Sequence, residues 1–266
     1  MSHYLLEVKD LNCKFEIERN LFSKNKYLHV LNNINFSLKK GSTLGVVGES
    51  GCGKSTLCKT LLNLNNKERG EIIWFSKNID KFTKKEFKHF RKKVQIIFQD
   101  PYGSLNPRMT IGSIISEPLG IYKKENNKKS KTLKVLDIME RVGLSDMLFN
   151  RFPHELSGGQ CQRVGIARSI INEPDVLICD EPVSSLDLSV QSQILDLLKT
   201  LKSKLNITML FVSHDLAVVK SISDEVMVLK EGEIVEKSSA EEVFNNPKHI
   251  YTKKLISSVP KINDIG

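Results

Sequence analysis

The sequence has no apolar stretch long enough to cross a membrane as a helix. Its apolar runs are short, with residues 176–179 among the longest, whereas a membrane-spanning helix needs about 20 such residues. Residues 1–7 lack the basic start and apolar continuation of a secretory signal peptide. The sequence therefore argues against an integral membrane protein and offers no support for a secreted one.

Cysteine pairs with metal-ligand spacing are also missing. None of the five cysteines forms a C-x-x-C pair, and no histidine lies at zinc-ligand spacing from one. An odd, scattered set in a chain of 266 residues is typical of reduced thiols in a cytosol. We expect these side chains to fill small spaces in the core. They are Cys13, Cys52, Cys58, Cys161 and Cys179.

The composition of the sequence is that of an ordinary globular protein with more basic than acidic residues. Hydrophobic residues make up 40% and charged residues 27%, which excludes a disordered chain. Lysine and arginine number 40 against 31 acids, so the formal net charge is +9, which can indicate nucleic-acid or membrane-surface binding. Much of the excess lies in residues 77–93 and 123–134, outside the motifs described below. We interpret it as a solvated basic face and expect no direct nucleic-acid partner.

Short apolar strands alternate with helical patterns along most of the chain, which predicts an α/β fold with a mostly parallel sheet. Residues 103–172 differ, because apolar residues recur there at helical spacing, and we expect a helical insertion. The expected strands are 5–15, 30–38, 43–47, 71–74, 94–98, 176–179, 208–212 and 225–229, and the expected helices are 55–64, 83–93, 131–142 and 189–205.

A phosphate-binding loop is indicated where the chain fits the pattern G-x-x-x-x-G-K-[ST]. Glycines allow the tight turn that directs successive N–H groups at phosphate oxygens, and the helix that follows adds its positive end. Lys54 would neutralise the β- and γ-phosphates, and the Ser55 hydroxyl would coordinate Mg²⁺. The residues expected to bind the nucleotide are Gly48, Glu49, Ser50, Gly51, Cys52, Gly53, Lys54, Ser55 and Thr56.

A second motif is the apolar strand 176–179, which ends in Asp180 and Glu181. A buried strand end does not tolerate acids without a partner, and a Mg²⁺–nucleotide would supply one. Asp180 would hold the Mg²⁺, and Glu181 could polarise an attacking water as a general base. Alone, the pair would equally suit a helix N-cap, but beside a phosphate-binding loop it favours nucleotide hydrolysis.

The segment Leu156-Ser157-Gly158-Gly159-Gln160 resembles the signature motif of ABC-type ATPases, and it precedes the acidic pair as in that family. The resemblance implies a P-loop NTPase (RecA-like) α/β core with a mostly parallel sheet, an N-terminal antiparallel β portion and an inserted α-helical subdomain. In that family two ATPase domains meet head to tail. The residues Ser157, Gly158, Gly159 and Gln160 would therefore cap the γ-phosphate of the partner's ATP.

The same resemblance implies roles for residues elsewhere. Gln99 would contact Mg²⁺ and the attacking water, His214 would bond the γ-phosphate, and Asp187 matches the aspartate of the D-loop. Phe15 fits the aromatic residue that stacks on adenine, with Tyr27 as a weaker candidate. An aromatic residue in a strand can equally belong to the core.

The resemblance also implies a division of the chain into parts. Residues 1–102 and 173–235 would form the ATP-binding core with its N-terminal β portion. Residues 103–172 would form the helical signature subdomain. Residues 236–266 would be a C-terminal tail of the peptide-importer type.

Residues 98–110 and 153–163 are similar to the ATPases of peptide importers, and residues 246–255 are similar to the tail motif of oligopeptide, dipeptide and nickel importers. The resemblance is strongest to the second ATPase subunit of oligopeptide/dipeptide importers. This implies an ATPase that uses ATP and Mg²⁺ and drives transport through dimer closure. Its partners would be a second ATPase subunit, either a paralogue or another copy, two transmembrane permease subunits and, indirectly, a substrate-binding protein. It would be peripheral, at the cytoplasmic face of the cell membrane.

Several alternatives remain open from the sequence. The length of the chain is nearer to that of nickel-importer ATPases. The basic charge would suit a soluble ABC-type ATPase acting on nucleic acid or ribosomes, although such proteins usually carry two ATPase domains or a long coiled-coil insertion. A regulator that only binds nucleotide is disfavoured by the intact acidic pair. The tail lacks the clustered cysteines that hold an iron–sulfur cluster in some relatives, so we expect none.

Overall fold

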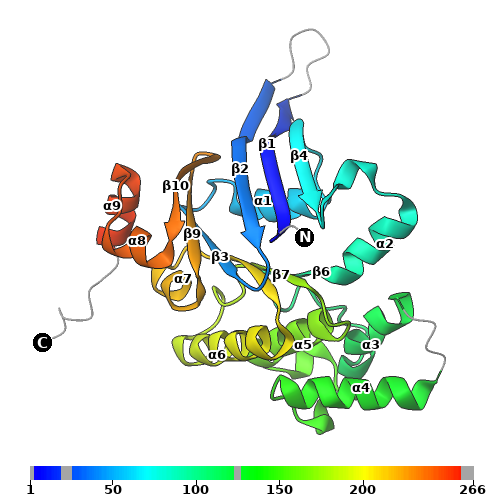
Figure 1. Ribbon diagram of the computed structural model, residues 1–266. Coiled ribbons are helices and arrows are strands. Elements are labelled where there is room, and N and C mark those ends of the chain that lie inside the picture. Colours follow the sequence, from blue (N-terminus) through cyan, green and yellow to red (C-terminus); the bar gives the residue numbers. More distant parts are fainter. Residues whose placement is uncertain (1–2, 19–25, 123–126, 259–266) are drawn as a thin grey trace, which may run out of the picture. The chain divides into compact units, whose positions relative to one another are not determined.

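The computed structural model describes residues 3–18, 26–122 and 127–258. Two compact units are formed, one by Met1–Phe82 with Leu210–Gly266 and the other by Thr83–Met209 (Figure 1). The strands are β1 (Tyr4–Glu18), β2 (Lys26–Lys39), β3 (Thr43–Val47), β4 (Arg69–Trp74), β5 (Lys77–Asn78), β6 (Val94–Ile97), β7 (Val176–Asp180), β8 (Thr208–Val212), β9 (Glu225–Lys230) and β10 (Glu233–Ser239). The helices are α1 (Lys54–Leu61), α2 (Lys84–Lys93), α3 (Ile111–Tyr122), α4 (Lys128–Arg141), α5 (Gly158–Ile170), α6 (Leu188–Leu205), α7 (Leu216–Ile222), α8 (Ala240–Asn245) and α9 (Ile250–Ser257).

The first unit contains an antiparallel sheet with the strand order β2-β1-β4-β5. In its register, Val8 of β1 faces Phe36 of β2, and Leu11 faces Ile34. These four side chains are buried, because apolar and polar residues alternate along both strands and one face of the sheet is covered. The sheet is the N-terminal antiparallel portion that the resemblance implied.

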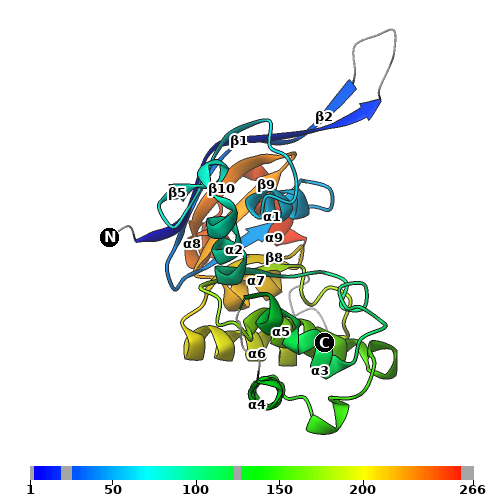
Figure 2. The same cartoon turned by 90° about the vertical axis from the view of Figure 1, so that its right-hand side faces the viewer.

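A second set of strands in this unit carries the phosphate-binding loop. β3 pairs in parallel with β9, and β10 pairs with β9 as an antiparallel strand. All five residues of β3 are buried, as expected for a short apolar strand covered on both faces. α1 packs on β2, α7 packs on β3, and α8 and α9 lie beside β10 (Figures 1 and 2). β3 therefore delivers residues 48–53 from a rigid, buried support.

The second unit combines a parallel strand pair with helices. β6 pairs with β7, so that Val94 faces Val176 and Ile96 faces Ile178. α5 packs on β6 and also contacts α3, α4 and α6 (Figure 2). β8 begins in this unit, where the Thr208 N–H donates to the Asp175 carbonyl at 3.0 Å, and it ends in the first unit.

The sequence predicted the strands and longer helices closely, and the ranges of β3 and β8 were predicted residue for residue. The predicted helical character of residues 103–172 is confirmed by α3, α4 and α5. β10 was not predicted, because only Ile234 and Val235 are apolar among its seven residues. The helices α7, α8 and α9 were not predicted, because six to eight residues make only about two helical turns and show little periodicity. Residues 259–266 of the predicted tail, and residues 123–126 of the predicted helical insertion, lie outside the described residues.

Two further expectations can be compared with the structure. No disulfide joins any two of the five cysteines, and all five are buried, which confirms their packing role. The compact units group the chain by spatial contact, whereas the three-part division predicted from the sequence concerns function, and that division stays a prediction. Among the described helices, none is both long and apolar enough to cross a bilayer.

The only tryptophan of the chain links the antiparallel sheet to the helix that follows the phosphate-binding loop. Trp74 is fully buried at the end of β4, and its indole N–H donates to the carbonyl of Leu61, the last residue of α1, at 2.9 Å. This bond satisfies one of the carbonyl groups that a helix end leaves without an intrahelical partner.

We expect Trp74→Phe to lower the free energy of unfolding by about 1–3 kcal/mol, because it removes this bond and leaves a cavity. Chemical denaturation followed by circular dichroism measures the change. Leu64→Ala is the control, because Leu64 is 55% exposed and its truncation should change stability by less than about 0.5 kcal/mol. Equal stability of Trp74→Phe and the wild type would contradict the role of the bond.

Candidate active site

The phosphate-binding loop lies between the buried strand β3 and the N-terminus of α1. Lys54, the first residue of α1, is 5% exposed. Its ammonium donates to the carbonyl oxygens of Gly48 at 2.7 Å and Glu49 at 2.9 Å. A buried ammonium needs such partners, and these bonds hold the positive charge inside the curve of the loop.

Two glycines of the loop are required by close backbone contacts. Gly48 and Gly53 have φ angles of 157° and 108°, which glycine adopts most readily. A Cβ atom at Gly48 would collide with the carbonyl oxygen of Leu229, and one at Gly53 would lie 2.8 Å from the carbonyl oxygen of Val30. The loop therefore packs directly against the backbone of β9 and β2.

Cys52 is a packed side chain of the loop and shows no sign of a reactive one. It is 7% exposed, and burial raises the pKa of its thiol despite the nearby Lys54. Its carbonyl accepts the Gly232 N–H at 3.1 Å, which ties the loop to the β9–β10 turn. The thiol is therefore protonated at neutral pH and has little nucleophilic character.

His214 and Phe15 belong to the same unit as the loop. The Ser213 N–H donates to the carbonyl of Val46 at 3.2 Å, and Val46 belongs to β3, the strand that leads into the loop. His214 is the next residue after Ser213, and its side chain is exposed. Phe15 lies on β1 and is 40% exposed, so it is not a core residue. Tyr27 is 47% exposed, and the Lys14 ammonium lies 4.8 Å from the centre of its ring.

The acidic pair lies at the end of β7 in the second unit. Asp180 is 4% exposed and Glu181 is 8% exposed. The Gln99 amide donates to Glu181 Oε2 at 3.2 Å, so the structure brings together two residues that are 82 positions apart. Glu181 has a φ angle of 50°, an unusual conformation for a residue with a side chain, and such conformations cluster at functional sites.

The signature segment forms a regular helix start. The Ser157 hydroxyl accepts the Gln160 N–H at 3.3 Å, and the Gln160 side chain accepts the Ser157 N–H at 2.9 Å. This reciprocal pair is a capping box, as the S-x-x-Q spacing allows. A Cβ atom at Gly159 would lie 2.6 Å from a methyl carbon of Val190, so glycine lets α5 approach α6 closely. Asp187 caps α6, and the hydrogen bond from the Val190 N–H is the main cause of its lowered pKa.

The structure thus places the predicted residues in two groups. The first unit contains Phe15, residues 48–56 and His214. The second unit contains Gln99, residues 157–160, Asp180, Glu181 and Asp187. Each group has the internal geometry described above.

Sequence reasoning gave no individual role to three residues that hold these groups in place. The Gln162 amide, 1% exposed on α5, donates to the Pro182 carbonyl at 2.7 Å and so ties the signature helix to the segment after Glu181. The Tyr102 hydroxyl donates to the Leu156 carbonyl at 3.1 Å. Tyr251 of the tail contacts the phosphate-binding loop. For Gln162, a polar side chain on the apolar face of a helix could have indicated a buried hydrogen-bond partner. The sequence gives no comparable indication for Tyr102 or Tyr251.

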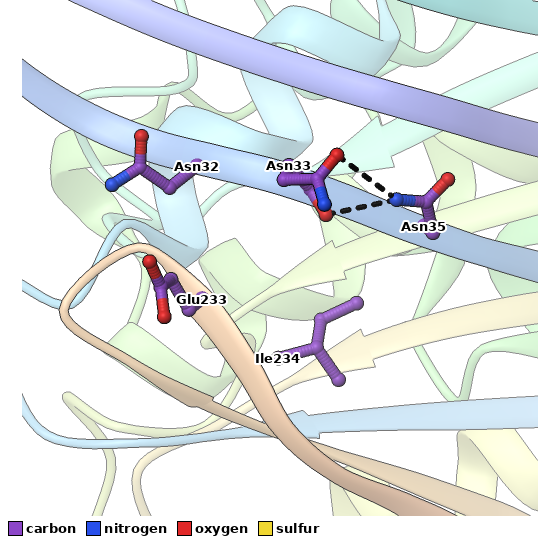
Figure 3. A pocket seen from close by; sticks show the side chains of 5 residues that line it. All are labelled: Asn32, Asn33, Asn35, Glu233 and Ile234. Carbon is purple, nitrogen blue, oxygen red and sulfur yellow. Dashed lines mark hydrogen bonds between the residues drawn. The ribbon is translucent and has the colours of Figure 1, made fainter.

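A pocket of about 360 Å³ opens in the first unit between β2 and β10 and contains none of the predicted site residues (Figure 3). Its lining includes Asn33 and Asn35, and the Asn35 amide donates to the Asn33 carbonyl at 2.9 Å and to Asp10 Oδ1 at 3.1 Å. Asp10 and Asn33 both have positive φ angles at irregularities of the β1–β2 pairing. These side chains therefore stabilise a β-bulge.

Comparison with known proteins connects these two groups of residues to one family. The family described as ABC transporter matches residues 31–184. Residues 235–265 match the oligopeptide/dipeptide transporter C-terminal region. The oligopeptide transport ATP-binding protein OppF of Haemophilus influenzae is 50% identical over 96% of this chain and 78% of its own length. The dipeptide transport ATP-binding protein DppF of the same organism is 45% identical over 97% of this chain and 79% of its own.

Solved structures agree with the sequence matches. The ATP-binding cassette MJ0796, in a dimeric post-hydrolysis state bound to ADP and Pi, superposes with a TM-score of 0.79 at 26% identity, over 88% of this chain and 98% of that one. CbiO1 from Clostridium perfringens, part of the ABC transporter complex cbiONQ, gives a TM-score of 0.77 at 31% identity over 92% of both chains. The chain therefore belongs to the ABC transporter family and is one of its ATP-hydrolysing subunits.

Proposed function

We propose that this protein is the ATPase subunit of an importer for oligopeptides or dipeptides. The observation that carries the proposal is the combination, in one chain, of the ABC transporter match with the C-terminal match found in peptide transporters. The relatives named for oligopeptide and dipeptide transport, at 43–50% identity, support it. Nothing in the described residues favours nickel transport or nucleic-acid binding over this function.

The phosphate-binding loop and α1 bind the phosphates of ATP. N–H groups of the loop and of the start of α1, other than the Glu49 N–H that bonds Tyr251, supply positive charge together with the Lys54 ammonium, and a phosphate oxygen would replace a carbonyl as a partner of Lys54. Phe15, exposed on β1, stacks on the adenine ring. His214 bonds the γ-phosphate.

Mg²⁺ fits the oxygen-bearing residues of the chain. Within the described residues there is no cluster of three or more acidic, histidine or cysteine side chains that could hold a metal by themselves. Proteins commonly bind Mg²⁺ through one or two carboxylates together with substrate phosphates, and the Asp180 carboxylate, 4% exposed at the end of β7, can supply one. Ser55, Gln99 and Asp180 would hold the ion. When bound, it neutralises phosphate charge during hydrolysis.

Glu181 acts as the general base that polarises the attacking water. A base must be fixed in direction to accept a proton efficiently, and the Gln99 amide at 3.2 Å from Glu181 Oε2 supplies that constraint. The positive φ angle of Glu181 directs the chain sharply away from β7 after Asp180. The two neighbouring acids therefore have different roles. Asp180 would bind the metal ion, and Glu181 would polarise the attacking water.

The signature residues 157–160 complete the site of a second ATPase subunit. Two such subunits meet head to tail, and a paralogue is the preferred partner, with a second copy of this chain as the alternative. Dimer closure is transmitted to two transmembrane permease subunits, which receive cargo from a substrate-binding protein. This chain is peripheral, at the cytoplasmic face of the cell membrane, and it needs no spanning helix of its own for this role.

Glu181→Gln removes the base but keeps the shape of the side chain. We expect ATP binding to persist and turnover of the assembled transporter to fall by about 10²- to 10⁴-fold, with the ATPase dimer held closed. Phosphate release and size-exclusion chromatography with ATP measure the two effects. Undiminished turnover would remove Glu181 from the catalytic role.

Ser157→Arg tests the head-to-tail arrangement. The bulky cation should block hydrolysis at the partner's phosphate-binding loop and leave this chain's own loop able to hydrolyse ATP. The measurement is turnover in mixed dimers in which only one of the two loops is intact. Ser203→Arg, an exposed position near the end of α6, is the matched control and should leave both sites active. Loss of hydrolysis only at the variant's own loop would contradict the arrangement.

Uptake by cells tests the transported substrate. A strain that lacks this protein should lose uptake of labelled short peptides and keep uptake of Ni²⁺. Expression of the wild type should restore peptide uptake, and expression of Glu181→Gln should not. Loss of Ni²⁺ uptake with normal peptide uptake would overturn the proposed substrate while leaving the ATPase assignment intact.

A further inference from the structure

The C-terminal tail is anchored to the first unit by a buried carboxylate. Glu236 of β10 is 9% exposed and accepts the N–H groups of Lys248 at 2.8 Å and His249 at 3.0 Å. Burial alone would raise the pKa of Glu236, but the hydrogen bonds that it accepts outweigh this and keep the pKa below its usual range. The carboxylate is therefore ionised at neutral pH, and it fixes the chain at the start of α9.

His249 then begins α9 and places Tyr251 in its first turn. The His249 imidazole accepts the Tyr251 N–H at 3.2 Å as an N-cap. The Tyr251 ring is 7% exposed and has the Lys230 ammonium 5.5 Å from its centre. The position of the Tyr251 side chain is thus set by the Glu236 carboxylate, by the His249 cap of α9 and by Lys230 at the end of β9.

The Tyr251 hydroxyl reaches the phosphate-binding loop. It accepts the Glu49 N–H at 3.1 Å, across 202 residues of sequence. Burial raises the pKa of Tyr251, so the hydroxyl is neutral at physiological pH. A tail that matches the oligopeptide/dipeptide transporter C-terminal region therefore contacts the predicted phosphate-binding loop.

The contact holds one particular peptide group from both ends. The Glu49 N–H belongs to the same peptide unit as the Gly48 carbonyl, which accepts the Lys54 ammonium at 2.7 Å. Tyr251 and Lys54 therefore hold the two polar ends of a single peptide plane. Glycine at position 48 makes this plane easy to rotate, because glycine accepts a wide range of backbone angles.

We propose that Tyr251 is a positioning residue for the phosphate-binding loop, through which the C-terminal tail sets the affinity for nucleotide. The hydroxyl keeps the Gly48–Glu49 peptide, and with it the Lys54 ammonium, in the arrangement that receives phosphate. Without it, part of the population must reorient before binding, and the apparent dissociation constant equals the intrinsic one divided by the fraction of molecules that stay competent to bind. By linkage, bound nucleotide must in turn strengthen the docking of α9.

The first test is calorimetric titration of the full-length chain with ADP. Tyr251→Phe removes only the hydroxyl, and we expect the dissociation constant to rise about 3- to 10-fold with one site per chain preserved. Tyr4→Phe is the matched control, because it removes a tyrosine hydroxyl from the start of β1, and it should bind ADP as the wild type does. A merely structural defect would instead lower the number of sites and leave the constant unchanged. This test depends on nucleotide binding and is independent of the transported substrate.

The second test measures the reciprocal effect by hydrogen exchange. Exchange of the α9 amides should slow when ADP binds to the wild type, and the slowing should shrink in Tyr251→Phe. The proposal is overturned if Tyr251→Phe binds ADP within twofold of the wild type, or if Tyr4→Phe weakens binding equally. It is also overturned if ADP leaves exchange in α9 of the wild type unchanged.

Discussion

The close packing of the phosphate-binding loop against neighbouring backbone is the constraint on which the first unit depends. Gly48 leaves no room for a side chain beside the Leu229 carbonyl, and Gly53 leaves none beside Val30. β2, β9 and the buried strand β3 must therefore keep a fixed register for the loop to form. A side chain at either glycine would force the loop away from its supports, and Lys54 would lose the carbonyls that hold it.

In the second unit, a buried polar bond links the segment after Glu181, the proposed general base, to helix α5. The apolar strand β7 carries Asp180 and Glu181 to its end, and the Gln162 amide bonds the Pro182 carbonyl directly after them. Buried amides are costly unless they are bonded, so this bond restricts how α5 can lie against that segment. The segment that follows Glu181, the proposed general base, and the helix that begins at the signature residues are therefore held together within this unit.

The C-terminal tail is connected to the phosphate-binding loop by a series of hydrogen bonds. The sequence indicated a tail similar to those of peptide importers and gave none of its residues a role. The structure joins Glu236, His249 and Tyr251 into one connection that ends on the loop. A segment that matches the oligopeptide/dipeptide transporter C-terminal region thus contacts the predicted phosphate-binding loop.

The sequence by itself predicted most of the elements and named the residues of the candidate site. Strand alternation, caps such as the S-x-x-Q box at Ser157, and the phosphate-binding pattern are local, so residues close in sequence reveal them. Only the tertiary structure decided that Gln99 bonds Glu181, that Gln162 bonds Pro182 and that Tyr251 bonds Glu49. These partners are 82, 20 and 202 residues apart. No local pattern encodes such a pairing, because it depends on the path of the whole chain between the two residues.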